Sequence, residues 1–201
     1  VLPDAPYIDY GSGKRAYLSP ILDCAGEVIS YAVSESQDLS MISAMLDDIR
    51  KDTIHEGTVF HSDQGALYMS DQFQERLKEM GLIQSMSRRG NCWDNAAMES
   101  FFGHLKDHCH FAGCVAFQEV KKMIDDYIEY YNNERPQWTR MKMTPAAYAR
   151  YLKEMDEQEF EAYLAKERQK YEQMITRSIE QTDKHGEHLR SVISSFVEET
   201  R

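Results

Sequence analysis

The sequence has few cysteines and no long apolar run. Four cysteines are scattered through 201 residues, which is too few for a disulfide framework in a chain of this size, so we expect reduced thiols. No apolar stretch approaches the roughly 20 residues that a membrane helix requires, and the first residues carry no basic-then-apolar secretion signal. These absences predict a cytoplasmic protein with no membrane partner.

Positive charge is also scarce. The chain has 23 Lys and Arg against 34 Asp and Glu, a formal net charge of −11. The imbalance is spread out, because residues 153–201 hold 8 basic and 12 acidic side chains, which leaves 15 and 22 upstream. Such a balance disfavours nucleic-acid binding over the whole surface, since contacts of Lys and Arg with phosphate supply most of the sequence-independent affinity. Local basic spots, such as Arg88 with Arg89 and Arg140 with Lys142, are candidates for phosphate contacts.

Periodicity predicts a core of strands and helices. Strands are expected at residues 17–23, 28–33, 58–62 and 82–86, with a weaker one before Gly11. Helices are expected from a cap at Asp38 or Ser40, from a cap at Ser70, around Glu99, and over residues 118–132. This order predicts an α/β fold with a sheet of mixed direction.

Beyond Leu152, apolar residues recur at helical spacing and predict a C-terminal helical extension. One stripe contains Phe160, Leu164, Tyr171 and Ile175. A stripe of this kind is unstable unless it is buried on something. A helical pair lying on its own core and a surface for dimerisation are both open interpretations.

Two acidic residues stand in distinctive settings. Asp63 ends the run His61-Ser62-Asp63 after a β-branched and aromatic segment, whereas Glu99 lies in an apolar pattern of helical period that begins after Asp94. One carboxylate is therefore expected at a strand end and the other on a helix. His61 is interpreted either as a group that orients a ligand or as one that closes the strand.

Five ordered motifs resemble the integrase core of the insertion-sequence-three family of bacterial DDE transposases, which are relatives of retroviral integrases. The motifs are HSDQG at 61–65, SMSRRGNCWDNA at 85–96, MESFF at 98–102, YNNERP at 131–136 and MTP at 143–145. The similarity runs from Asp4 to about Leu152. It implies a ribonuclease-H-like mixed sheet flanked by helices, with residues 1–152 as the catalytic core and residues 153–201 as a helical tail.

The resemblance also implies a chemistry. It assigns Asp4, Asp63 and Glu99 as the catalytic residues and as ligands of two Mg²⁺ ions, with Mn²⁺ able to substitute and Asp63 shared by both ions. The implied reaction is metal-dependent hydrolysis of a phosphodiester followed by DNA strand transfer. Asp4 departs from the family pattern, because prolines and alanine stand beside it where threonines are expected, and proline suits a central strand poorly.

This departure leaves two alternatives open. The first is a catalytically inactive core that is used for assembly or regulation, and the second is a nuclease that cuts DNA without joining ends. Metal binding would separate the first alternative from an active transposase.

The expected partners are DNA at the element ends and at the target, together with further copies of the chain. Five residues are predicted to contact DNA, namely Lys106, Arg88, Arg89, Asn91 and Arg135. The DNA-binding helix-turn-helix segments that the family carries upstream have no counterpart in this sequence. The aromatic residues Tyr130, Tyr131 and Trp138 are predicted to pack at the end of the core.

Overall fold

The computed structural model describes residues 7–49, 54–87, 96–166, 169–170 and 173. The chain divides into two compact units, Val1–Tyr151 and Leu152–Arg201. None of the helices in the described ranges is long and apolar enough to cross a membrane.

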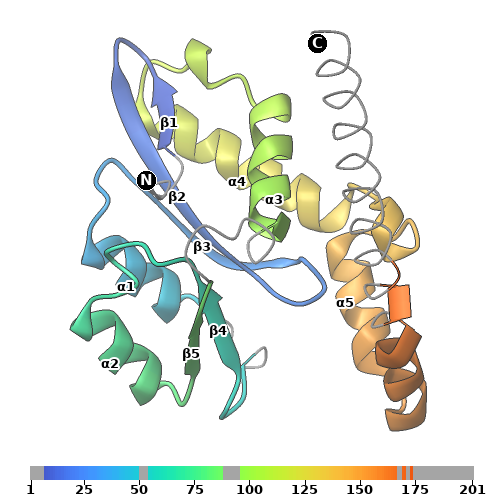
Figure 1. The fold of residues 1–201 in the computed structure, drawn as a ribbon. Coiled ribbons are helices and arrows are strands. Elements are labelled where there is room, and N and C mark those ends of the chain that lie inside the picture. The colour runs from blue at the N-terminus through green and yellow to red at the C-terminus, as the bar shows by residue number, and fades with distance from the viewer. Residues whose placement is uncertain (1–6, 50–53, 88–95, 167–168, 171–172, 174–201) are drawn as a thin grey trace, which may run out of the picture. The chain divides into compact units, whose positions relative to one another are not determined.

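The first unit begins with an antiparallel sheet of three strands (Figure 1). The strands are β1 (Tyr7–Tyr10), β2 (Lys14–Leu22) and β3 (Val28–Ser34). Gly26 takes a φ of +75° in the turn between β2 and β3, a conformation that side chains disfavour. The three predicted strands and their antiparallel order are confirmed, and β1 is the weaker strand expected before Gly11.

A second pair of strands is parallel. β4 (Val59–Ser62) pairs with β5 (Ile83–Met86) in a register that places Ser62 opposite Met86. The connection between them contains α2 (Asp71–Glu79), as parallel neighbours require. Both strand directions are therefore present in the described residues, but they occur in two separate sheets rather than in the single mixed sheet that the sequence predicts.

The predicted helix starts are confirmed at two positions. The Asp38 carboxylate accepts a hydrogen bond from the Met41 N–H and caps α1 (Leu39–Asp47). The Ser70 hydroxyl accepts from the Phe73 N–H and caps α2. Each cap satisfies one backbone donor that the first helical turn leaves without a partner.

Helices cover both faces of the antiparallel sheet. α3 (Ala96–His108) and α4 (Phe117–Asn133) belong to one core cluster with Leu18 and Val28 of the sheet. α1 and α2 belong to a second cluster, against which Ile21 and Ile29 pack. Because neighbouring strand residues point to opposite faces, the two clusters lie on opposite sides of the sheet.

After α4, a short 3₁₀ turn, η3 (Trp138–Arg140), precedes α5 (Pro145–Glu154). In the second unit, residues 157–166 are helical. Asp156 caps this helix, because its Oδ1 accepts from the Glu159 N–H at 2.8 Å. Phe160 and Leu164 remain 38% and 37% exposed, while Tyr171 and Ile175 lie outside the described residues, so the role of this stripe stays open.

Leu105→Ala should destabilise the first unit by about 2–5 kcal/mol, because Leu105 is 0% exposed and its loss leaves a cavity under α3. Denaturant unfolding of the whole chain measures this change. Leu164→Ala is the matched control, since the same truncation at a residue that is 37% exposed should cost much less. Equal losses in the two variants would contradict the assigned core.

Candidate functional site

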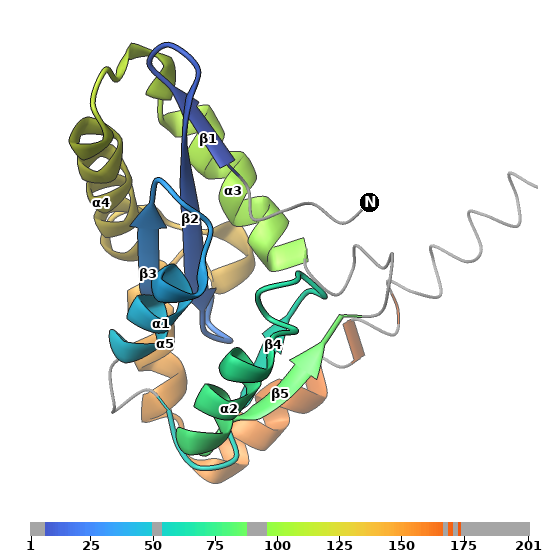
Figure 2. The ribbon, with the colours of Figure 1, turned by 90° about the vertical axis from the view of Figure 1, so that its left-hand side faces the viewer.

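The predicted acidic residues lie at the same end of the first unit. Asp63 directly follows β4 and is half-buried, and Glu99 is exposed in the first turn of α3. In both ribbon views the N-terminal end of α3 points toward the carboxyl ends of β4 and β5 (Figures 1 and 2). Asp4 lies outside the described residues, so the complete carboxylate cluster stays a prediction.

The Asp63 carboxylate is held by its own loop. Its Oδ1 accepts a hydrogen bond from the Gly65 N–H at 2.9 Å, which is the geometry of an Asx turn. Its Oδ2 has no hydrogen-bond partner within the described ranges. One oxygen is thus oriented by the backbone while the other is available, as a ligand for a hard cation requires. Together with Glu99 this donor set is all oxygen, which suits Mg²⁺ or Mn²⁺ better than zinc.

The loop that carries Asp63 is fastened to the sheet through Tyr68. The Tyr68 hydroxyl lies 3.0 Å from Ser19 Oγ, and Ser19 is a residue of β2 that is 2% exposed. Burial raises the pKa of the Tyr68 hydroxyl, the hydrogen bond with Ser19 opposes this shift, and the negative charge of Asp63 adds to it. Tyr68 therefore stays neutral at physiological pH and keeps its hydrogen bond.

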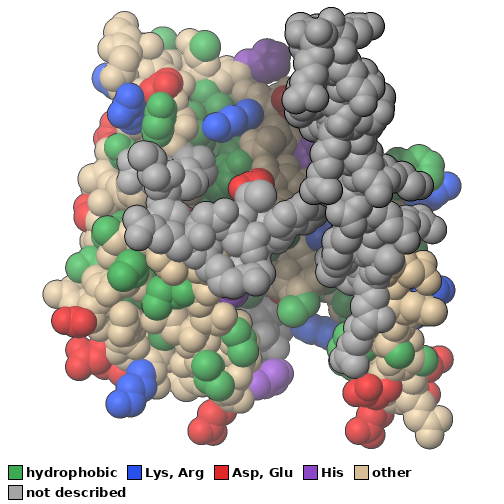
Figure 3. All heavy atoms as spheres, in the orientation of Figure 1, with side chains coloured by type: hydrophobic (Ala, Val, Ile, Leu, Met, Phe, Trp, Pro, Cys, Tyr) green, Lys and Arg blue, Asp and Glu red, His purple; other side chains and the backbone are tan. Residues whose placement is uncertain are grey.

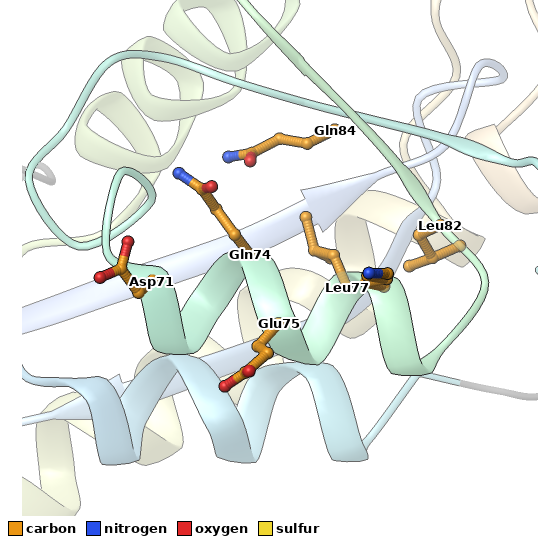
Figure 4. Close-up of a pocket in the computed structure, with 7 residues that line it drawn as sticks. Asp71, Gln74, Glu75, Leu77, Leu82 and Gln84 are labelled. Carbon is orange, nitrogen blue, oxygen red and sulfur yellow. The ribbon is translucent and has the colours of Figure 1, made fainter.

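The side-chain amides of two glutamines donate hydrogen bonds to backbone carbonyls of the same loop. Gln84 Nε2 donates to the Tyr68 carbonyl at 2.7 Å, and Gln74 Nε2 donates to the Met69 carbonyl at 3.2 Å. Both residues line a pocket of about 410 Å³ along α2 and β5, where their side chains point toward each other (Figure 4). Neither Asp63 nor Glu99 lines this pocket, and the two amides already bind the loop. The two glutamines of this pocket therefore stabilise the loop that carries Asp63, and the pocket is not part of the proposed metal site.

His61 links β4 to the end of β5 through both nitrogens of its ring. Its Nδ1 lies 3.1 Å from Ser85 Oγ and its Nε2 lies 3.1 Å from Ser87 Oγ. Both ring nitrogens are thus engaged between β4 and β5. Of the two interpretations of His61, the arrangement favours the structural one over a ligand-orienting or proton-transfer group.

The predicted DNA contacts are only partly within the described ranges. Lys106 is exposed on α3, seven residues and therefore about two helical turns after Glu99. Arg135 is half-buried after α4, and its positive charge opposes the rise that burial causes in the pKa of Tyr127. Arg88, Arg89 and Asn91 lie outside the described residues.

One packing prediction is wrong. Tyr131 is buried, and Tyr130 stacks on His108 with ring centroids 4.9 Å apart, as expected. Trp138, however, is 82% exposed. Trp138 begins η3 in the short loop that the backbone bridge between Gln137 and Met143 closes, and no residue of this loop belongs to either core cluster.

Basic side chains are dispersed on the one face of the molecule that Figure 3 shows. On the face shown in Figure 3, Lys and Arg side chains are scattered singly rather than gathered into one basic patch. Among the described residues, no group of three His, Cys, Asp or Glu side chains could hold a metal ion. The cluster of Asp4, Asp63 and Glu99 that the resemblance implies therefore stays a prediction, because Asp4 lies outside the described residues.

Gly65→Ala should destabilise the chain by about 1 kcal/mol, roughly the value of one hydrogen bond. An added Cβ would lie 2.9 Å from Asp63 Oδ1 and 3.3 Å from the Tyr68 ring, so the carboxylate must turn away from the Gly65 N–H. Thermal unfolding measures the loss. Gly113→Ala is the control, because a Cβ there meets nothing within 4 Å; a loss of equal size in both variants would contradict the contact.

Comparison with known proteins supports one family. Two families described as integrase core domains match the sequence, one over residues 4–92 and the other over residues 80–145. The chain is 44% identical over 140 residues to the putative transposase InsK of insertion sequence element IS150 from Escherichia coli K12, covering 68% of this chain and 50% of that protein. It is 40% identical over 136 residues to an uncharacterized transposase-like protein of Haemophilus influenzae, covering 67% and 63%. The matched part thus spans about half to two thirds of these relatives' lengths.

Solved structures identify the fold. The magnesium complex of the HTLV-2 integrase catalytic core domain aligns in its dimeric form with a TM-score of 0.51 and 16% identity, covering 71% of this chain and 90% of that one. The trimeric form gives a TM-score of 0.53, also at 16% identity, and covers 72% and 91%. The predicted ribonuclease-H-like fold is confirmed. Taken with the integrase core matches, which together span residues 4–145, it shows that this chain belongs to the integrase core domain family and is similar to transposases of bacterial insertion sequences.

Proposed function

We propose that this chain is the catalytic core of a DNA transposase and that Asp4, Asp63 and Glu99 are its metal ligands. The observation that carries the proposal is the Asp63 carboxylate at the end of β4, which is oriented by the Gly65 N–H and whose Oδ2 has no hydrogen-bond partner among the described residues. Glu99 lies in the first turn of α3, whose N-terminal end points toward the carboxyl end of β4 (Figures 1 and 2). The similarity to transposases supports the reaction class.

Magnesium ions suit the proposed cluster. Mg²⁺ takes few protein ligands and prefers carboxylate oxygens, so three acidic residues suffice for two ions, and Mn²⁺ can replace them. The bound ions would supply charge neutralisation and a deprotonated nucleophile. Within the chain, Gly65 orients Asp63, and Tyr68 fixes the loop that carries both. The magnesium in the HTLV-2 integrase core is consistent with this choice.

The proposed reaction has two balanced steps. In hydrolysis, a water molecule loses a proton as its oxygen bonds to phosphorus. The bond from phosphorus to the 3′ oxygen breaks, and this 3′ oxygen gains a proton and leaves as a 3′-hydroxyl, while the phosphate stays on the 5′ end of the other fragment. In strand transfer, the freed 3′-hydroxyl loses its proton and bonds to a phosphorus of the target strand, whose own 3′ oxygen leaves and is protonated. Each step replaces one phosphorus–oxygen bond by another, so no energy source is required.

DNA contacts are proposed for Lys106, Arg88, Arg89, Asn91 and Arg135. Lys106 shares α3 with Glu99, so one helix would present a metal ligand and a phosphate contact together. With a net charge of −11, much of the affinity for element ends and target DNA should come from other segments of the transposase. The active assembly is proposed to contain several copies of the chain and to act in the cytoplasm. No observation on the described residues favours the inactive-core alternative.

Asp63→Asn should lower Mg²⁺-dependent cleavage and joining by at least about 100-fold, because the amide keeps the shape of the carboxylate but lacks the charge that holds the cations. Gel assays with an element-end duplex measure both steps, and circular dichroism checks the fold. Asp126→Asn, at an exposed residue paired with Lys122, is the matched control and should stay active. Cleavage at the wild-type rate by the Asp63 variant would remove Asp63 from the site.

Lys106→Ala should weaken DNA binding and reduce the slope of log K against log salt concentration by about 0.9, the value of one phosphate contact on duplex DNA. Metal binding should be unchanged, because Lys106 is expected to contact phosphate only. Lys122→Ala serves as the control, since its side chain is 75% exposed and paired with Asp126 at 2.6 Å. The same salt slope for wild type and the Lys106 variant would make Lys106 an ordinary surface residue.

A further inference from the structure

Trp138 is presented to solvent with a cation on one face. Its side chain is 82% exposed, more than any other large hydrophobic residue in the described part of the chain. Lys142 Nζ lies 4.4 Å from the centroid of its ring, a cation–π distance. The ammonium group lies over one face of the indole, and the 82% exposure of Trp138 indicates that the other face is accessible as far as the described residues are concerned.

The loop that carries Trp138 is braced at its base. Gln137 N–H donates to the Met143 carbonyl at 2.9 Å, and Lys142 N–H donates to the Gln137 carbonyl at 3.0 Å. The Arg140 guanidinium donates to the Ala25 carbonyl in the turn between β2 and β3 and to the Gln137 side chain. These hydrogen bonds fix the loop that carries Trp138 to the rest of the first unit.

The same loop contains two residues in a disfavoured backbone conformation. Met141 and Lys142 have φ values of +53° and +62°, in the left-handed region that residues with a side chain rarely adopt. Strain of this kind persists where the surrounding contacts fix it, and it is common at ligand sites. Here it places Lys142 beneath the indole of Trp138.

The local charge is opposite to that of the whole chain. Residues 135–151 contain Arg135, Arg140, Lys142 and Arg150 and no Asp or Glu, whereas the chain as a whole has a net charge of −11. Lys142 and Arg150 are exposed. A segment with basic residues and no acidic ones favours binding of a polyanion, and an exposed aromatic ring favours stacking with a planar group. A nucleic acid strand has both features.

We propose that Trp138 and Lys142 form a stacking site for an unpaired nucleotide of DNA, with the base on the open face of the indole and the adjacent phosphate near Lys142. The proposal rests on the proposed function, because an enzyme that cuts and joins strands handles DNA ends, where terminal bases lack a stacking neighbour. Bases inside a duplex are already stacked on both sides, so single-stranded DNA should bind here in preference. Stacking accepts any base, and the site should show little sequence preference.

Tryptophan fluorescence tests the proposal directly. The chain contains two tryptophans, so Trp93→Phe leaves Trp138 as the sole emitter in the full chain. With EDTA present and at low ionic strength, a single-stranded oligothymidylate should quench this emission. An abasic oligonucleotide of equal length carries the same charge without bases and should quench it far less.

Substitutions separate stacking from charge. Trp138→Ala should weaken binding of the oligothymidylate by about 5- to 100-fold, the range for loss of one stacked base, and Trp138→Phe should retain most of the affinity. Lys142→Gln should weaken binding less and reduce its dependence on salt. The controls Val115→Ala, at a side chain that is 73% exposed, and Lys122→Gln should both bind as wild type.

Three results would overturn the stacking site. They are an unchanged affinity in Trp138→Ala, equal quenching by the abasic strand, and a shift of Trp138 emission that follows protein concentration without DNA, which would assign the surface to a second copy. Because these measurements use EDTA, they are independent of cleavage. If oligothymidylate does not bind at Trp138 but Asp63→Asn loses cleavage, the proposed function holds and the stacking site is wrong. If oligothymidylate binds at Trp138 but Asp63→Asn still cleaves, the stacking site holds and the proposed role of Asp63 is wrong.

Discussion

The hydrogen bond between Tyr68 and Ser19 joins the loop that carries Asp63 to the antiparallel sheet. Ser19 is 2% exposed in β2, and its hydroxyl lies 3.0 Å from both the Tyr68 hydroxyl and Met45 Sδ. Gln74 and Gln84 hold the next carbonyls of the same loop. With the loop fastened at these points, the Gly65 N–H can orient one oxygen of Asp63 and leave the other available to a cation. The chemistry proposed for Asp63 depends on this arrangement, because a carboxylate on a free loop would bind metal only after an entropic cost.

The packing of one side of α3 sets the positions of two further residues of the proposed site. Phe101, Phe102 and Leu105 pack into the core and fix the rotation of the helix, which leaves Glu99 and Lys106 exposed. Their positions also suit the helix dipole, since Glu99 lies in the first turn and Lys106 in the last. One packed helix can therefore serve two proposed contacts, with metal near its start and phosphate further along. Because the chain has a net charge of −11, most of its surface should repel phosphate, and contact with DNA should depend on a few local residues of this kind.

Local signals in the sequence predicted much of the fold. The caps at Asp38 and Ser70, the three antiparallel strands and the segment of α4 follow from residue type and spacing over a few positions. The contact between Ser19 and Tyr68 spans 49 positions, and no local pattern indicates it. The sequence predicts that Trp138 packs at the end of the core, but Trp138 is 82% exposed in a loop that belongs to neither core cluster. The role of Asp4 rests on family resemblance, because Asp4 lies outside the described residues.

The central claim is that Asp4, Asp63 and Glu99 converge on divalent cations. Anomalous diffraction from crystals of the chain soaked with Mn²⁺ tests it most directly, because the ions and their ligands are then located together. Two manganese peaks about 4 Å apart, bound by oxygens of the three carboxylates, are expected. Carboxylates that point away from one another, with manganese absent or bound elsewhere, would contradict it.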